Sequence, residues 1–183
     1  GDLGLESEEE KKEAEAAAEE NKDLFEAMKE ALGDKVEKVE LSLSLESTPA
    51  VLATSRYGYS ATMERIMRSQ TMQNPEKAKY MRSRKIMEIN PRHPIITNLK
   101  NLVEEDPESD VARDFANLLY DSSLMNSGFT IDDANDFAGR LYARLKESLQ
   151  IDSLELEPEI ELPAEEEEEK EETEEDDGSI KFD

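Results

Sequence analysis

The chain has 183 residues, enough for one domain with a hydrophobic core plus tails, and its net charge of −25 lies mostly at the two ends, because residues 24–154 carry 21 acids against 17 bases. It contains no cysteine, which excludes disulfide bonds, cysteine-ligated zinc and cysteine nucleophiles. Its apolar runs are only a few residues long and its first ten residues are acidic, so neither a membrane span nor a secretory signal is expected.

The first predicted segment, residues 1–23, is an acidic helical linker. From Ser7 to Leu32 the residues are mostly Glu, Lys and Ala, which form helices readily. Larger apolar side chains become regular only from Leu24, so we expect this helix to dock by its second half alone. Gly33 should end it, because glycine is preferred just past a helix C-terminus. The globular domain is therefore predicted over residues 24–154.

Two strands are predicted next. Apolar and polar residues alternate from Val39 to Leu45, the period of a strand with one face in a core. Ser47–Pro49 favours a turn, and Val51–Thr54 is predicted to return beside the first strand. A third strand is expected at Ile86–Ile89.

A glycine hinge and a methionine-rich helix follow the second strand. Gly58 permits backbone angles that tyrosine resists, and Ser60 is a good N-cap. One face of the helix then carries the larger apolar side chains, at Tyr59, Met63, Ile66 and Met67. Methionine is flexible and polarisable, so such a face either fills a core or accepts partners of many shapes. The spacing alone favours a core.

Residues 76–92 form a basic segment after the helix break at Asn74 and Pro75. A basic patch is one way to bind nucleic acid, and a nucleic-acid-binding or general protein-interaction module is the alternative function that the sequence leaves open. Only Tyr80 is interleaved among the bases and no nucleic-acid motif is present, so a solvated face around the third strand is the preferred interpretation. The bases are Lys77, Lys79, Arg82, Arg84, Lys85 and Arg92.

Three helices are predicted in the C-terminal half. Pro94 is well placed to open the first, with His93, the only histidine, in a capping or surface role and not in a metal site. Asp110 is the expected N-cap of the second helix, and Asp132 or Asp133 opens the third. The apolar stripes of the last two helices either close the domain's own core or pair with a second copy in a four-helix bundle.

The remaining chain, residues 155–183, is predicted to be a disordered acidic tail, because it lacks the apolar surface needed to offset the entropy of ordering. No Gly-rich phosphate loop, GxSxG or HExxH motif is present, so we expect neither catalysis nor a resident cofactor or metal. The elements together predict an α/β (α+β) domain with a small sheet of about three strands packed against helices.

Several of these segments, in this order, resemble the C-terminal domain of the ninety-kilodalton heat-shock chaperones. They are Leu32–Val39, Tyr57–Met67, Met87–Ile96 and Leu118–Asp152. The resemblance implies the C-terminal portion of an ATP-dependent chaperone whose ATP and magnesium site lies in domains absent from this chain, and the missing initial methionine favours a fragment or a processed product. It also implies a dimer whose four-helix bundle would use Leu118, Leu119, Phe137, Leu141, Leu145 and Leu149.

The same resemblance implies a client surface. Unfolded proteins would contact Tyr59, Met63 and Met67, with Tyr59 in place of the family's usual tryptophan, while Ile66 stays a predicted core residue. Co-chaperones are further candidate partners. The Asn90–Pro94 segment followed by a glutamate-rich tail is similar to the endoplasmin branch, and Lys181–Asp183 would need only Glu and Leu to resemble a retention signal. The endoplasmic-reticulum lumen is therefore expected, with the cytoplasm as the alternative.

Overall fold

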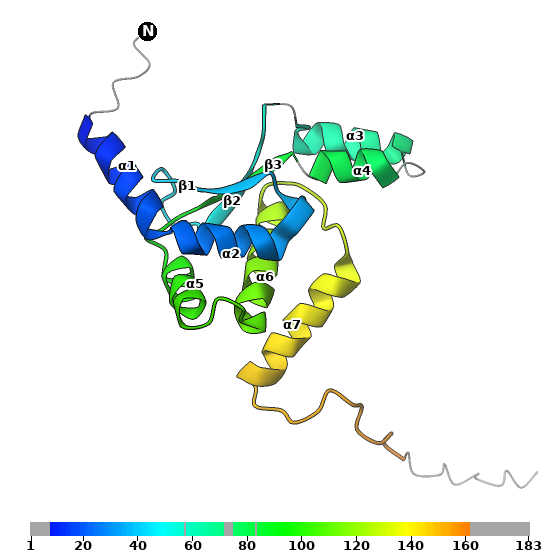
Figure 1. The fold of residues 1–183 in the computed structure, drawn as a ribbon. Coiled ribbons are helices and arrows are strands. Elements are labelled where there is room, and N and C mark those ends of the chain that lie inside the picture. The colour runs from blue at the N-terminus through cyan, green and yellow to red at the C-terminus, as the bar shows by residue number, and fades with distance from the viewer. Residues whose placement is uncertain (1–7, 57, 72–74, 83, 162–183) are drawn as a thin grey trace, which may run out of the picture.

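A three-stranded sheet of mixed direction organises the fold of this computed structural model, which describes residues 8–56, 58–71, 75–82 and 84–161 (Figure 1). The predicted α/β (α+β) class is confirmed. Within the described ranges the elements are α1 (Glu8–Glu20), α2 (Lys22–Leu32), the 3-10 turn η1 (Gly33–Lys35), β1 (Lys38–Leu41), β2 (Ala50–Thr54), α3 (Ala61–Thr71), α4 (Pro75–Arg82), β3 (Lys85–Ile89), α5 (Pro94–Glu105), α6 (Asp110–Asn126) and α7 (Ala134–Ser148).

The last strand in sequence, β3, is the central strand of the sheet. It pairs in parallel with β1, where Val39 is opposite Met87, and antiparallel with β2, where Leu52 is opposite the same Met87. The prediction that the second strand returns beside the first is therefore wrong. The chain leaves β2, forms α3 and α4, and only then inserts β3 between the two earlier strands.

Strand β1 ends at Leu41, in the middle of the strand that the alternation predicts. The backbone N–H of Ser42 still donates to the carbonyl of Ile89 at 2.9 Å. The partner strand then reaches Pro91, which has no N–H to continue the ladder. Leu43 consequently lies outside the core and is 50% exposed. The prediction of a strand beyond Leu41 is therefore wrong, because the partner strand β3 ends at Ile89.

Helices α2, α5 and α6 gather on the same side of the sheet (Figure 1). The first side chain of the core cluster is Leu24, which lies where the apolar pattern of the sequence begins. The alternation of β3 is strict, so every second residue of this central strand is buried. The larger apolar core side chains are Leu24, Met28, Leu32, Val36, Val39, Leu52, Met87, Ile89, Ile96, Leu99, Val103, Leu119, Tyr120, Leu124 and Phe129.

The predicted N-terminal helix is divided into α1 and α2 at Asn21. The Asn21 side chain is buried and donates from Nδ2 to the carbonyl of Ala17 at 2.7 Å, a local hydrogen bond that competes with helix continuation. Gly33 ends α2 as predicted, with a φ of +53° and its N–H donating to the carbonyl of Lys29.

Helix α4 lies beside α3, as Figure 1 shows, in a segment where the sequence predicts only a solvated basic face. Pro75 is its first residue, where the missing proline N–H removes no helical hydrogen bond. Basic residues of this segment contact other side chains: Lys79 Nζ lies 3.4 Å from Asp34 Oδ2, and the Arg84 guanidinium lies 4.7 Å from the ring centre of Tyr80. Asn74 of the predicted helix break lies outside the described residues.

Side-chain caps define the helices of the C-terminal half. His93 caps α5 as predicted, its Nδ1 accepting a hydrogen bond of 3.1 Å from the N–H of Ile95. The N-cap of α6 is Ser109, one residue before the predicted Asp110. Asp133 caps α7 by accepting from two backbone N–H groups at 3.0 and 3.1 Å.

Beyond the helices, residues 152–161 form no helix or strand and are exposed. The remaining residues of the predicted tail, including Lys181–Asp183, and residues 1–7 of the predicted linker lie outside the described part of the chain. Among the described helices, none is both long and apolar enough to cross a membrane.

Candidate functional site

Helix α3 presents its apolar side chains outward. Met63 is 50% exposed and Ile66 is 53% exposed, while Tyr59 and Met67 are half-buried. The prediction that Ile66 is a core residue is therefore wrong. In α3 the buried side chain among those described is a charged one, Glu64.

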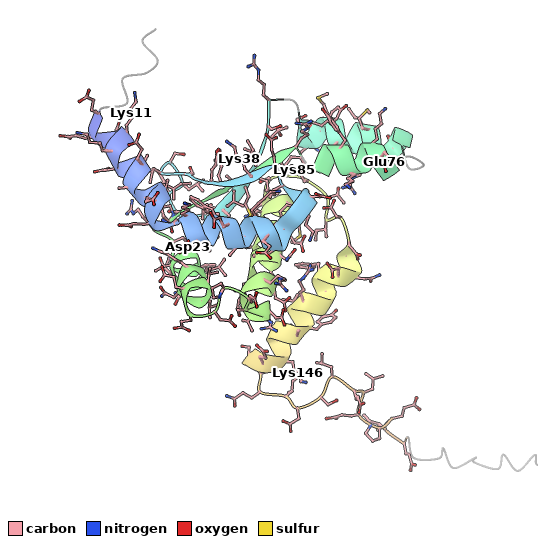
Figure 2. The ribbon with its side chains drawn as sticks, in the orientation of Figure 1. Lys11, Asp23, Lys38, Glu76, Lys85 and Lys146 are labelled. Atoms are coloured by element: carbon pink, nitrogen blue, oxygen red, sulfur yellow. The ribbon has the colours of Figure 1, made fainter. Side chains whose placement is uncertain are left out.

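Glu64 is buried because it pairs with a lysine of the central strand. Its Oε2 lies 2.9 Å from the Nζ of Lys85, and the two side chains are 4% and 1% exposed. The Lys85 ammonium also lies 4.8 Å from the ring centre of Phe129. Figure 2 labels Lys85 near the middle of the molecule, whereas Lys11, Glu76 and Lys146 lie at its periphery. The predicted solvated basic face is wrong for Lys85.

Arg68 extends this pair into a network. Its Nη2 donates to Glu64 Oε1 at 3.2 Å and to Asp132 Oδ1 at 3.3 Å. The Tyr120 hydroxyl of α6 in turn donates to Asp132 Oδ2 at 3.4 Å. Burial, together with the nearby charge of Asp132, raises the pKa of Tyr120 far above its ordinary value. The network therefore fixes α3 to β3, to the segment before α7 and to α6.

The hinge before α3 depends on close packing of the backbone. A Cβ on Gly58 would lie 2.7 Å from Thr54 Cγ2 and 2.9 Å from the carbonyl oxygen of Arg84, so any side chain there would collide. The predicted N-cap is confirmed, since Ser60 Oγ accepts a hydrogen bond of 3.2 Å from the N–H of Met63. The hinge thus sets where α3 begins, and the ionic network sets which of its faces is buried.

Helix α7 repeats the same arrangement at the other end of the molecule. None of its residues is buried, and Leu141, Leu145 and Leu149 are exposed at intervals of four, while Phe137 is half-buried. Residues spaced by four lie on one helical face. The helix therefore carries an outward apolar stripe.

Charged residues attach α7 to α6. Arg144 Nη2 lies 3.4 Å and Arg140 Nε 3.9 Å from the carboxylate of Asp114. The Arg144 guanidinium also lies 5.9 Å from the ring centre of Phe115. On both α3 and α7, charged side chains make inward contacts, while several larger apolar side chains are exposed: Met63, Ile66, Leu141 and Leu145.

The predicted interface residues of α6 divide between two environments. Leu119 is buried in the domain's own core, whereas Leu118 is half-buried. Leu118 lines a groove of about 430 Å³ between α5 and α6, together with the exposed side chains of Ile95 and Phe115. Phe115 therefore both lines this groove and contacts Arg144, one of the residues that attach α7 to α6.

A second cavity, of about 490 Å³, is acidic. It is lined by Lys35, Leu32 and five aspartates, of which Asp121 is buried. Burial raises the pKa of Asp121 above its ordinary value of 3.8, and the positive charges of Lys35 and Arg140 act in the opposite direction. Within the described ranges no group of three or more acidic or histidine side chains is arranged to hold a metal ion.

Asp121→Asn is expected to stabilise the protein at pH 7. A carboxyl group with a raised pKa in the folded state binds its proton more readily when folded, so stability falls as pH rises from about 3.8 through the folded pKa. The variant lacks this penalty, and its melting temperature should exceed the wild type at pH 7 but not at pH 3. Circular dichroism melts at both pH values test this, with the exposed Asp152→Asn as control. A lower melting temperature at pH 7 would mean that Lys35 and Arg140 outweigh burial.

The sequence did not single out Glu64 or Arg68. It named Lys85 only as one base of the basic segment and Asp132 only as a candidate start of the last helix, so their part in the ionic network was missed. One signal was available for Lys85, because extending the alternation of Met87 and Ile89 back by two residues places it on the buried face of β3. No comparable signal identifies Glu64, which follows the predicted N-cap like any solvated helical acid.

Comparisons with known proteins agree in pointing to one family. The family model described as Hsp90 protein matches residues 1–177. An endoplasmin homolog of Arabidopsis thaliana is 43% identical over 139 residues, which cover 72% of this chain and 17% of the relative. Heat shock protein 83 of Leishmania donovani is 46% identical over 128 residues, covering 70% and 28%. The chloroplastic heat shock protein 90-5 of Arabidopsis thaliana is 43% identical over 141 residues, covering 77% and 18%. The chain thus spans less than a third of each of these relatives.

Proposed function

This chain belongs to the Hsp90 family, and from that premise we propose that it is the C-terminal dimerisation and client-contact module of an ATP-dependent chaperone. The observation that supports the proposal is the orientation of α3 and α7. Each helix is attached to the domain by charged side chains and directs apolar side chains outward. Exposed apolar surface of this kind is typical of a site for another protein.

The partner proposed for α7 is a second copy of this chain. Leu141, Leu145 and Leu149 of two copies would pack together with α6, giving a four-helix bundle. Phe115 and Leu118, which line the groove between α5 and α6, are available to the same interface. Leu119 supports the interface indirectly, since it is part of the core behind α6.

The partner proposed for α3 is an unfolded client protein. Tyr59, Met63 and Met67 would supply an aromatic ring and two flexible thioethers, and the exposed Ile66 extends the same surface. Such a surface adapts to many apolar sequences because methionine has three rotatable side-chain bonds. Co-chaperones are further proposed partners of the whole protein.

ATP binding and hydrolysis, with magnesium, are proposed for parts of the whole protein outside this chain, which covers only 17% to 28% of three similar relatives. The endoplasmic-reticulum lumen is the location we propose, and the endoplasmin homologs among the relatives support it. The cytoplasm is the alternative, and immunofluorescence against a marker of each compartment decides between them.

Tyr59→Ser combined with Met63→Ser should weaken client binding several-fold while changing the melting temperature by no more than about 2 °C, because neither side chain is buried in the core. Retention of reduced, carboxymethylated α-lactalbumin, a permanently unfolded protein, measures binding. The matched control compares Met63→Ser alone with Leu43→Ser, because both side chains are 50% exposed. A melting temperature lowered by several degrees with unchanged binding would make these residues core residues and contradict the proposal.

A further inference from the structure

The orientation of α3 is opposite to the one that hydrophobicity favours. The helix carries Met63 and Ile66 on one side and Glu64 and Arg68 on another. Burying the apolar side chains would remove more apolar surface from water, which is the main favourable contribution to packing. The folded domain instead buries Glu64 and leaves Met63 and Ile66 half exposed. Some interaction must therefore oppose a roll of the helix.

Lys85 provides that opposition. It lies on the buried face of the central strand, opposite Thr54 of β2, and is 1% exposed. Apart from its contact with Glu64 Oε2 at 2.9 Å, its Nζ makes no hydrogen bond within the described part of the chain. If α3 rolled to bury its apolar side, Glu64 would leave and a buried ammonium group would have no counter-charge.

A second contact opposes the same movement. Arg68, one turn after Glu64, reaches both the Glu64 carboxylate and Asp132, which belongs to the segment before α7. The two residues thus hold the helix at two successive turns on its inward side. Among the described residues of α3, the small Ala61 packs against the core cluster and no larger apolar side chain belongs to it, so the ionic contacts are a major part of the attachment of α3.

We propose that Lys85 and Glu64 are positioning residues that lock the rotation of α3, so that Met63 and Ile66 stay available to a client. The inference rests on the client contact proposed above. The inference goes beyond that contact, because it assigns a buried ion pair the role of deciding which face of α3 is exposed. The pair would then contribute to structural specificity and not only to stability.

An apolar replacement of both residues separates these two roles. Glu64→Met with Lys85→Met keeps similar side-chain volume and removes both buried charges, so the melting temperature should equal or exceed that of the wild type. Of the two restraints, only the contact of the partly exposed Arg68 with Asp132 then remains, and α3 should roll its apolar face toward the sheet. Binding of carboxymethylated α-lactalbumin should then fall several-fold at undiminished stability, an effect that loss of structure does not explain.

The rotation itself can be measured with one engineered thiol, because the chain has no cysteine. Ile66→Cys in the otherwise wild-type chain should react rapidly with a maleimide, since this position is 53% exposed. In the Glu64→Met/Lys85→Met background the reaction should be at least several-fold slower. The matched control is Lys38→Met with Glu40→Met, which removes an exposed ion pair and should leave the rate unchanged.

An unchanged labelling rate in a stable Met pair would overturn the lock. If the Met pair fails to fold, the same measurement is made on a Glu64→Leu/Lys85→Leu variant. Failure of both variants to fold would also overturn the proposed lock, because the two charges would then be required for stability itself. The labelling readout needs no client. If the wild type binds no unfolded protein but the labelling rates differ as expected, the proposed function fails and the lock stands.

Discussion

Lys85→Met alone is expected to lower the free energy of unfolding by about 3–5 kcal/mol, because it leaves the Glu64 carboxylate buried without its lysine partner. Arg68 remains 3.2 Å from Glu64, but its side chain is partly exposed and reaches only the other carboxylate oxygen. A residual contact of this kind places the expected loss toward the lower end of the range. The melting temperature should fall by about 10 °C.

The control for this prediction is Lys38→Met. Lys38 Nζ lies 2.7 Å from Glu40 Oε2, a shorter contact than the buried pair, but both side chains are exposed. Exposed ion pairs contribute only about 0–1 kcal/mol, because water screens their charges. Urea denaturation followed by circular dichroism gives both values. If the free energy of unfolding fell equally in the two variants, burial would not make the Glu64–Lys85 pair more important for stability than an exposed pair.

Leu141→Glu with Leu145→Glu is expected to convert a dimer into a folded monomer. The wild-type chain at micromolar concentration should sediment as a dimer, with the outward stripe of α7 buried between copies. Two carboxylates in that stripe would have to be buried on association, and this should raise the dissociation constant by roughly 100-fold or more. Neither leucine is in the domain's core, so the monomer should keep its helical circular dichroism spectrum.

The matched control for the dimer prediction is Leu154→Glu with Leu156→Glu. These leucines are also exposed, lie beyond α7 and belong to no helix or strand, so the variant adds the same charge without changing the stripe. It should remain a dimer at the same concentration. A wild-type chain that sediments as a monomer, or a dimer that survives both α7 substitutions, would contradict the proposed interface and leave the client surface of α3 to be tested separately.

The two proposed surfaces share one structural cause. A hydrophobic stripe on a helix is normally its attachment to the domain. In α3 and α7 charged side chains make much of the attachment instead, Glu64 and Arg68 in the first and Arg140 and Arg144 in the second. The stripe then remains available to another protein. Asp132 connects the two regions, since it pairs with Arg68 and immediately precedes the N-cap of α7.

Local chemistry was enough to predict many of the elements. Ser60, His93 and Asp133 cap their helices as expected, because a cap depends on the side chain and the few N–H groups that follow it. Gly33 ends α2 for a similarly local reason. The third strand was predicted within one residue from its own alternation. The ordered segments shared with the heat-shock chaperones also identified the family, which the comparisons confirm.

The order of the strands and the direction of the apolar stripes were decided only by tertiary structure. Periodicity tells which residues share a face, but not which face is inward, because that depends on what the rest of the chain places opposite. The inward face of α3 is determined by Lys85, which arrives on a later strand inserted between β1 and β2. For the same reason β1 ends where Pro91 follows its partner strand. The sequence by itself determined many of the elements and the family, while long-range pairing of charges and strands determined which surfaces the protein presents.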